Sequence, residues 1–154
     1  MKLNLEINNT DKSPIKKAFI RKVIIKTLGK SSYFELTKKS LNLSLALVSE
    51  MEITKLNKLY RKKNRVTDVL SFCEFENAEK LKKSTEPELF LGELILCYSY
   101  IKESARNCTS ENDLKKELAR IIAHGVLHLL AFSHGKKMFA IQDDVAVFFA
   151  TSKV

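Results

Sequence analysis

The sequence predicts a mixed α/β fold in which a small sheet of about four strands packs against four to five helices. Two observations predict this class. Apolar segments with strand-like character alternate along the chain with segments whose apolar residues recur at helical spacing. The length of 154 residues and the hydrophobic content of 45% suit one domain over residues 1–154 with a core of its own.

The first third of the chain contains two predicted strands and two predicted helices. Residues 3–7 alternate apolar and polar side chains, as a half-buried strand does. Ser13–Pro14 then favours a helix start, and an apolar stripe at helical spacing continues to about Gly29. Residues 43–48 are apolar and strand-like, and apolar side chains over residues 53–60 indicate a shorter helix.

Two further strands and a loop are expected in the middle of the chain. Residues 69–75 and 90–97 are rich in branched and aromatic side chains, which favour strands. Residues 78–88 between them are charged and contain Pro87, which indicates an exposed loop.

Three helices are expected in the last third. The first covers residues 98–108. The polar residues 109–113 can cap a long helix that runs from about residue 111 to 131. A last helix carries the apolar side chains between Met138 and Phe149.

Several classes of protein are excluded by absent motifs. No G-x-G-x-x-G or G-x-x-x-x-G-K-[ST] element is present, so no nucleotide cofactor is expected. No apolar run reaches the roughly 18 residues that span a bilayer, so no membrane partner is expected. The first residues, MKLNLEINN, lack the apolar region of a secretory signal, which favours a cytoplasmic protein. The three cysteines, Cys73, Cys97 and Cys108, are widely spaced and are expected to be reduced and mostly buried.

The charge balance favours a polyanionic partner. The chain has 27 Lys and Arg residues against 18 Asp and Glu residues, which gives a net charge of +9. Basic proteins gain affinity for nucleic acids by releasing the counterions that surround the phosphates.

All three histidines of the chain lie in one window, HGVLHLLAFSH, at His124, His128 and His134. On a helix, positions i and i+4 differ by about 40° in azimuth and about 6 Å in rise, so His124 and His128 can bind one metal. His134 can join them only if the chain leaves the helix near residues 131–133, and Gly135 is consistent with such a turn. Three imidazoles leave one coordination position open, as in a catalytic zinc site. Ordinary hydrogen-bonded histidines are the alternative, which the third histidine disfavours.

Gly125 follows the first histidine. Zinc peptidases with the H-E-x-x-H motif have a glutamate there that acts as the general base. Because Gly125 has no side chain, peptide hydrolysis by that mechanism would need a base from elsewhere.

A basic segment precedes the third predicted strand. No acidic residue occurs between Glu52 and Asp68. Ile53, Leu56 and Tyr60 are expected to face the core and to leave the basic side chains in solvent. Composition alone favours a solvated helix face, and a phosphate-binding face is the functional alternative. The basic residues of the segment are Lys55, Lys58, Arg61, Lys62, Lys63 and Arg65.

Three motifs together resemble one family. HGVLHLLAFSH is similar to the H-G-x-L-H-L-x-G-x-D-H element of the YbeY-type rRNA maturation factors, which are small zinc-binding endoribonucleases specific for single strands. LNKLYRKKNRVTDVLSF (56–72) resembles the family stretch L-N-x-x-Y-R-x-K-x-x-x-T-D-V-L-S-F, and LGELILC (91–97) resembles its L-G-D-[IL]-x-I-C strand. Met138, Phe139 and Gln142 also resemble the start of the family's closing helix.

The resemblance implies a metal site and a substrate. It implies that His124, His128 and His134 bind one Zn²⁺ per chain and that Arg61 is the functionally important arginine. It also implies that the polyanion is single-stranded RNA, in rRNA and ribosomal particles. Lys58, Lys62, Lys63 and Arg65 are the candidates for contact with the RNA backbone.

Three positions and one short segment depart from the family pattern. Ala131 replaces a glycine, so a left-handed turn there would cost about 1 kcal/mol or more. Ser133 replaces an aspartate next to the last histidine, and Cys73 replaces a proline. The acidic stretch after the last histidine is shortened to Gly-Lys-Lys (135–137), which makes the edge of the site more basic.

The leading hypothesis is therefore a zinc-dependent, single-strand-specific endoribonuclease of ribosomal RNA maturation, which includes processing of the small-subunit 3′ end and ribosome quality control. Water and the ribose 2′-hydroxyl are both compatible with the pattern as nucleophiles. Two alternatives are a zinc hydrolase of peptides or small molecules and a non-catalytic binding protein of ribosome assembly. Gly125 and the charge of +9 count against the first alternative.

Overall fold

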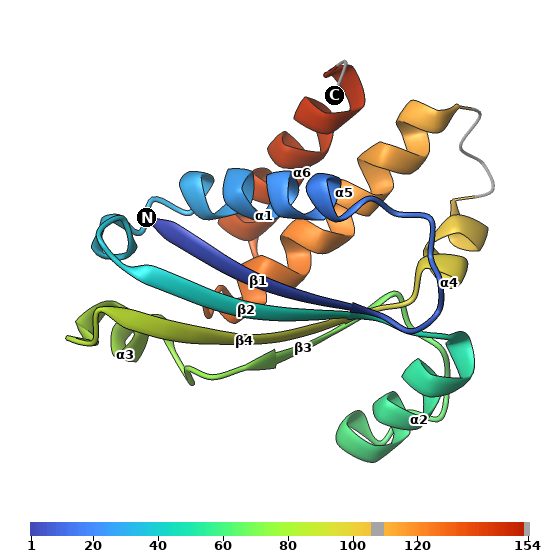
Figure 1. The fold of residues 1–154 in the computed structure, drawn as a ribbon, viewed down its shortest axis with the longest axis horizontal. Helices are drawn as coiled ribbons and strands as arrows, with labels where there is room; N and C mark the ends of the chain where they lie inside the picture. Colours follow the sequence, from blue (N-terminus) through green and yellow to red (C-terminus); the bar gives the residue numbers. More distant parts are fainter. Residues whose placement is uncertain (106–109, 153–154) are drawn as a thin grey trace.

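A mixed four-stranded sheet is the base of the fold (Figure 1). The computed structural model describes residues 1–105 and 110–152. Within these residues the strand order is β1-β2-β4-β3; β1, β2 and β4 are parallel, and β3 is antiparallel to β4. The strands are β1 (Lys2–Asn9), β2 (Ser40–Leu47), β3 (Val69–Cys73) and β4 (Glu88–Leu96). The predicted α/β class and the four predicted strands are confirmed.

Three long helices lie on one side of this sheet, where the third of them packs on the other two, and a fourth lies beyond the end of β2 (Figure 1). The three helices are α1 (Lys17–Lys30), α5 (Glu111–Leu129) and α6 (Lys136–Thr151), and the fourth is α2 (Glu50–Arg61). Two short helices, α3 (Ala78–Lys83) and α4 (Tyr98–Ser104), and a 3-10 turn, Phe34–Leu36, complete the described elements. No helix in the described part of the chain is long and apolar enough to span a bilayer.

The expectation of a loop over residues 78–88 is wrong for its first half, where α3 forms. Asn77 caps this helix, because its side-chain oxygen accepts a hydrogen bond from the Lys80 amide at 2.9 Å. Leu81 is fully buried and anchors the helix to the core. Because residues 78–88 contain few apolar side chains, the sequence pattern indicated neither the cap nor the buried leucine. The end of the helix expected over residues 98–108 lies outside the described residues.

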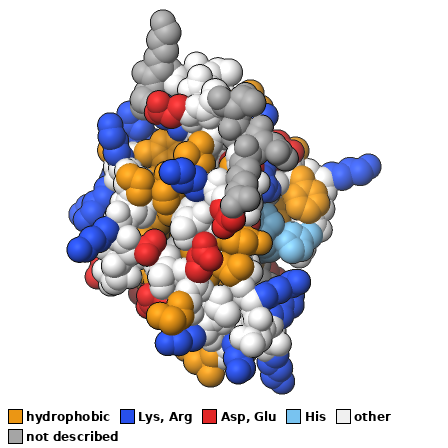
Figure 2. Space-filling view, turned by 90° about the vertical axis from the view of Figure 1, so that its right-hand side faces the viewer, with side chains coloured by type: hydrophobic (Ala, Val, Ile, Leu, Met, Phe, Trp, Pro, Cys, Tyr) orange, Lys and Arg blue, Asp and Glu red, His pale blue; other side chains and the backbone are white. Residues whose placement is uncertain are grey.

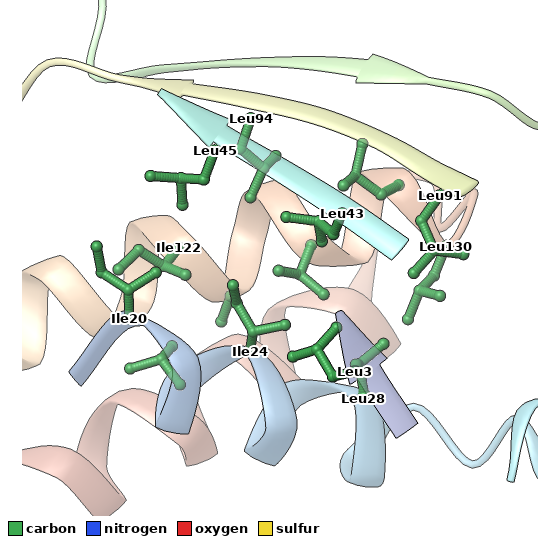
Figure 3. Close-up of a cluster of buried hydrophobic side chains, with 14 of the residues drawn as sticks. Leu3, Ile20, Ile24, Leu28, Leu43, Leu45, Leu91, Leu94, Ile122 and Leu130 are labelled. Atoms are coloured by element: carbon green, nitrogen blue, oxygen red, sulfur yellow. The ribbon is translucent and has the colours of Figure 1, made fainter. Parts of the chain in front are cut away.

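The core lies between the sheet and its covering helices (Figure 3). β2 contributes Leu41, Leu43, Leu45 and Leu47, all 0–2% exposed, while the alternating positions point to the other face. This period of two is what a strand with one buried face requires. Ile20 and Ile24 of α1 and Ile122 of α5 pack against these leucines.

Gly92 allows β3 to pair with β4. Its φ of 129° is a conformation that L side chains rarely adopt, and a Cβ atom there would lie 2.1 Å from the Phe72 carbonyl oxygen. The register between β2 and β4 also shifts next to this position, between Asn42 and Leu43. The close approach of β3 matters for function, because β3 carries one wall of the site described below.

We expect the substitution Gly92→Ala to destabilise the fold by about 2–3 kcal/mol, since both the backbone conformation and the contact with Phe72 become unfavourable. Urea unfolding followed by circular dichroism measures the change. Gly29→Ala is the matched control. No atom lies within 4 Å of a Cβ placed at Gly29 in α1, so this change should stabilise the protein by about 0.5–1 kcal/mol. Equal effects of the two substitutions would contradict the role of Gly92.

Candidate metal centre

Helix α5 holds the first two histidines on one face. Its N-terminus is fixed by a capping box, in which the Ser110 hydroxyl accepts from the Asp113 amide at 3.2 Å and the Asp113 carboxylate accepts from the Ser110 amide at 3.1 Å. Gly125 is buried against the sheet, where a Cβ atom would lie 2.9 Å from Leu94. His124 and His128 lie on the adjacent face of the helix, beside β3, and both are half-buried.

A left-handed turn after α5 brings the third histidine back to the first two. Ala131 has a φ of 60°, as the sequence expectation of a helix exit near residues 131–133 requires. The Ala131 amide donates to the His128 carbonyl at 2.8 Å, and the Phe132 amide donates to the Leu127 carbonyl at 3.0 Å. The Phe132 ring stacks on Tyr33 with centroids 5.2 Å apart, which fixes the turn against the core. His134 follows and is exposed.

The three histidine rings point their Nε2 atoms toward one another. The Nε2 atom of His128 lies 3.0 Å from Nε2 of His124 and 3.1 Å from Nε2 of His134. Each imidazole nitrogen carries either one proton or one lone pair, so His128 cannot satisfy both neighbours by hydrogen bonding. A single cation can accept all three lone pairs. Tetrahedral zinc with bonds of about 2.0–2.1 Å places ligand nitrogens about 3.3–3.4 Å apart, so the spacing fits such an ion after a small expansion.

Gln142 of α6 orients the first histidine. Its side-chain Oε1 lies 2.9 Å from Nδ1 of His124, and the glutamine is only 5% exposed. Because a carbonyl oxygen can only accept, Nδ1 of His124 must carry the proton, which leaves the lone pair on Nε2. In this tautomer Nε2 of His124 is free to bind a metal ion.

The environment of His128 keeps its ring neutral. Burial is the largest cause and lowers its pKa to about 4. The charged forms of His124, of His134 and of Arg61 lower the pKa further, while a backbone hydrogen bond at Phe132 raises it. A neutral imidazole is the form that binds a metal, so the ring is available as a ligand near neutral pH.

Arg61 faces the histidines across a cavity of about 450 Å³. It ends α2, and its guanidinium donates to the Ser71 carbonyl of β3 at 2.9 Å. Lys62 follows in the left-handed conformation with a φ of 58° and stops the helix. Lys63 and Arg65 then line the same cavity together with Arg61 and the three histidines.

Asn57 holds this basic loop in place. Its side chain is 3% exposed and donates to the Arg65 carbonyl at 2.9 Å, while its own carbonyl accepts from the Lys63 amide at 3.2 Å. One buried residue of α2 therefore ties both ends of the loop that carries the cavity's basic side chains.

The structure brings some of the predicted RNA-contacting residues together and not others. Lys63 and Arg65 line the cavity with the histidines, whereas Lys58 and Lys62 are exposed and do not line it. The expectation that Tyr60 faces the core is wrong. Its side chain is 59% exposed and packs edge-to-face on Phe72 at 5.0 Å. Tyr60 lies on the same face as Ile53, but in the last turn of α2, where Phe72 of the edge strand covers only part of its ring.

The cysteine expectation holds in part. Cys97 is buried, but Cys73 is exposed and lines the cavity, with its Sγ donating to the His128 carbonyl at 3.2 Å. Cys73 is the last residue of the edge strand β3, which explains its exposure. Cys108 lies outside the described residues.

Gln142 and Asn57 had not been assigned a role from the sequence. Each one leaves a signal in the pattern, however, since a polar residue occupies a position of the apolar stripe. Gln142 lies between Met138 and Val145 at helical spacing, and Asn57 lies four residues after Ile53. A buried polar residue in such a stripe needs a hydrogen-bond partner, and at both positions the partner belongs to the site.

The family relationship follows from comparison of the whole chain. The family model described as Endoribonuclease YbeY matches residues 6–146. The chain belongs to the YbeY endoribonuclease family. The resemblance inferred from the three motifs is thereby confirmed, as is the prediction of an endoribonuclease, a hydrolase that acts on RNA.

Individual members of the YbeY family match over most of their length. The Endoribonuclease YbeY of Halalkalibacterium halodurans is 38% identical over 122 residues, which are 73% of this chain and 75% of the relative. That of Macrococcus caseolyticus is 36% identical over 107 residues, 66% of this chain and 68% of the relative. The solution structure of TM1509 from Thermotoga maritima superposes with a TM-score of 0.57 at 26% identity, covering 95% of this chain and 89% of that one.

We expect Ala131→Gly to stabilise the protein by about 0.5–1 kcal/mol, because glycine removes the clash of a Cβ atom in the left-handed conformation. Thermal unfolding measures the change. Ala140→Gly, at an exposed position inside α6, serves as the control and should destabilise by about 1 kcal/mol. A loss of stability at both positions would show that the turn is unstrained.

Proposed function

We propose that the chain is a zinc-dependent endoribonuclease that cleaves single-stranded RNA in ribosomal RNA maturation, including the 3′ end of the small-subunit rRNA and the quality control of ribosomal particles. One observation carries the proposal. Three Nε2 atoms that converge on a metal position share a cavity with Arg61, Lys63 and Arg65. A metal-binding cluster beside three permanent or near-permanent positive charges suits the hydrolysis of a phosphodiester.

His124, His128 and His134 hold the zinc in this proposal, and the open side of the cluster faces the cavity. A zinc ion bound there supplies Lewis acidity for a phosphate oxygen or a water molecule. Gln142 keeps Nδ1 of His124 protonated and so keeps its Nε2 free for the metal. The low pKa of His128 keeps the second ligand deprotonated in neutral solution.

Arg61 stabilises the negative charge that develops on the phosphoryl oxygens. Its guanidinium is planar and permanently charged, and the hydrogen bond to the Ser71 carbonyl fixes one of its nitrogens. The remaining donors can point at a phosphate in the cavity without a loss of conformational freedom at that moment. Lys63 and Arg65 attract and align the neighbouring phosphates of the strand.

The structure disfavours a zinc peptidase. Gly125, at the position of the peptidase glutamate, faces the sheet rather than the cavity, because a Cβ atom there would lie 2.9 Å from Leu94 and 3.4 Å from Val69. A general base at this position would be directed into the core. A non-catalytic binding protein of ribosome assembly is the other rival, and it differs in having no chelator-sensitive cleavage.

We expect the purified protein to hold about one zinc per chain, measured by elemental analysis. His128→Ala should lose most of this zinc, because His128 is the ligand that contacts both others. Chelation should abolish cleavage of single-stranded RNA, and added zinc should restore it. RNA cleavage that survives complete removal of the metal would contradict the proposal.

We expect Arg61→Ala to reduce the rate of single-turnover cleavage at saturating protein by about a hundred- to a thousandfold, with a much smaller change in RNA affinity. Arg61→Lys should recover part of the rate, since lysine has the charge but not the planar donors. Lys58→Ala is the matched control on the same helix, outside the cavity, and should change only the affinity and its salt dependence. A wild-type rate for Arg61→Ala at saturation would reduce Arg61 to a docking residue.

A further inference from the structure

An exposed phenylalanine lies beside the metal cluster and has no part in the site described so far. Phe139, on α6, is 42% exposed. Its ring lies nearly parallel to that of His134, with centroids 6.0 Å apart and an angle of 17° between the planes. In Figure 2 the histidine side chains reach the surface between a hydrophobic side chain and a group of Lys and Arg side chains.

The position of Phe139 is fixed by its helix. Met138 and Gln142 of α6 are 1% and 5% exposed, and they turn the buried face of the helix toward α5. Phe139 consequently points outward. The contact with His134 on one side restricts its rotamers, so binding of a planar group to this ring orders little that is not already ordered. Phe139 does not line the cavity, which places it on the outer side of His134.

Two lysines precede this ring on α6, and Asp143 follows it by one turn. Lys136 and Lys137 begin α6 and are exposed, and the first turn of the helix contains no acidic residue. Lys137 also places its ammonium 5.5 Å from the centroid of the Phe132 ring. An exposed aromatic ring next to lysines is the combination that binds single-stranded nucleic acid, in which bases alternate with phosphates. The basic Gly-Lys-Lys segment (135–137) at the edge of the site is part of this surface.

We propose that Phe139 stacks on the base of a nucleotide adjacent to the scissile phosphate of the RNA. The inference rests on the proposed function, which places that phosphate between the three histidines and Arg61. A strand that leaves the cavity past His134 meets the exposed Phe139 ring next, with Lys136 in reach of the following phosphate. Phe139 thereby sets where along a single strand the cleavage falls, since only an unpaired base can stack on it.

The test measures the affinity of the zinc-loaded protein for short single-stranded RNAs in which one abasic site is moved along the strand. Fluorescence anisotropy is recorded before cleavage, and gels confirm that the RNA is intact. For the wild type, one position next to the cleaved bond should lose about tenfold in affinity when its base is removed. Phe139→Ala should bind the intact RNA about tenfold more weakly and should be insensitive to the abasic site at that position. Phe139→Trp should restore both the affinity and the sensitivity.

Phe148→Ala is the matched control, because Phe148 lies on the same helix, is 41% exposed and is remote from the histidines. It should keep the affinity and the sensitivity of the wild type. The zinc content of Phe139→Ala should equal that of the wild type, which shows that His134 is still in place.

Two results would overturn the inference. The first is a loss of affinity in Phe139→Ala that is the same for intact and abasic RNA at every position, which would show that Phe139 only packs against His134. The second is an affinity equal to that of the wild type for all of these RNAs. Failure of the proposed function is distinguishable, since the wild type would then bind none of the RNAs or cleave none of them in a zinc-dependent way.

Discussion

The close packing of α5 on the sheet at Gly125 sets the distance between this helix and the strands, and the rest of the site depends on that distance. A Cβ atom at this position would lie 2.9 Å from a methyl group of Leu94, so a larger residue would require Leu94 to shift or the helix to move away from β4. His124 directly precedes Gly125 and His128 follows it by one turn, so the position of this part of the helix also sets the positions of both histidines. The cavity therefore forms between α5 and the edge strand β3, and a helix displaced outward would separate the histidines from Arg61.

The electrostatics of the site follow from this packing. The three imidazoles contact one another, and His128 lies between the other two, half-buried and facing Arg61 across the cavity. Burial and these neighbouring charges together lower the pKa of His128, so its lone pair stays available for a cation. Arg61, Lys63 and Arg65 add positive charge to the cavity, which suits a polyanion such as RNA better than a neutral peptide.

The sequence predicted the frame of the fold and the centre of the site, because both depend on local patterns. The spacing of His124, His128 and His134 and the apolar stripes along the helices act over a few residues, and the structure agrees with them. The sequence did not predict the partners that depend on tertiary packing. The hydrogen bond from His124 to Gln142 joins two helices, and the hydrogen bond from Asn57 to Arg65 joins a helix to a loop.

Two expectations failed for a physical reason that a single sequence hides. The apolar spacing of α2 suggested that Tyr60 is buried, yet Tyr60 lies in the last turn of the helix, where its ring contacts Phe72 of the edge strand and stays 59% exposed. The charged stretch before Pro87 suggested a loop, yet one capping residue and one buried leucine are enough for a short helix. In both segments the outcome depends on the contacts that the tertiary structure offers, and the composition of the segment does not show these contacts.

The compactness of the histidine cluster in the chain has a consequence for folding. His124 and His134 are separated by one helix end and one turn, so bringing them together closes a very short loop at a small entropic cost. Arg61 and Gln142 reach the same place only when the sheet and the last helix have formed. A metal can therefore bind before the cavity has formed. Bound metal alone does not show that the chain has reached its native fold.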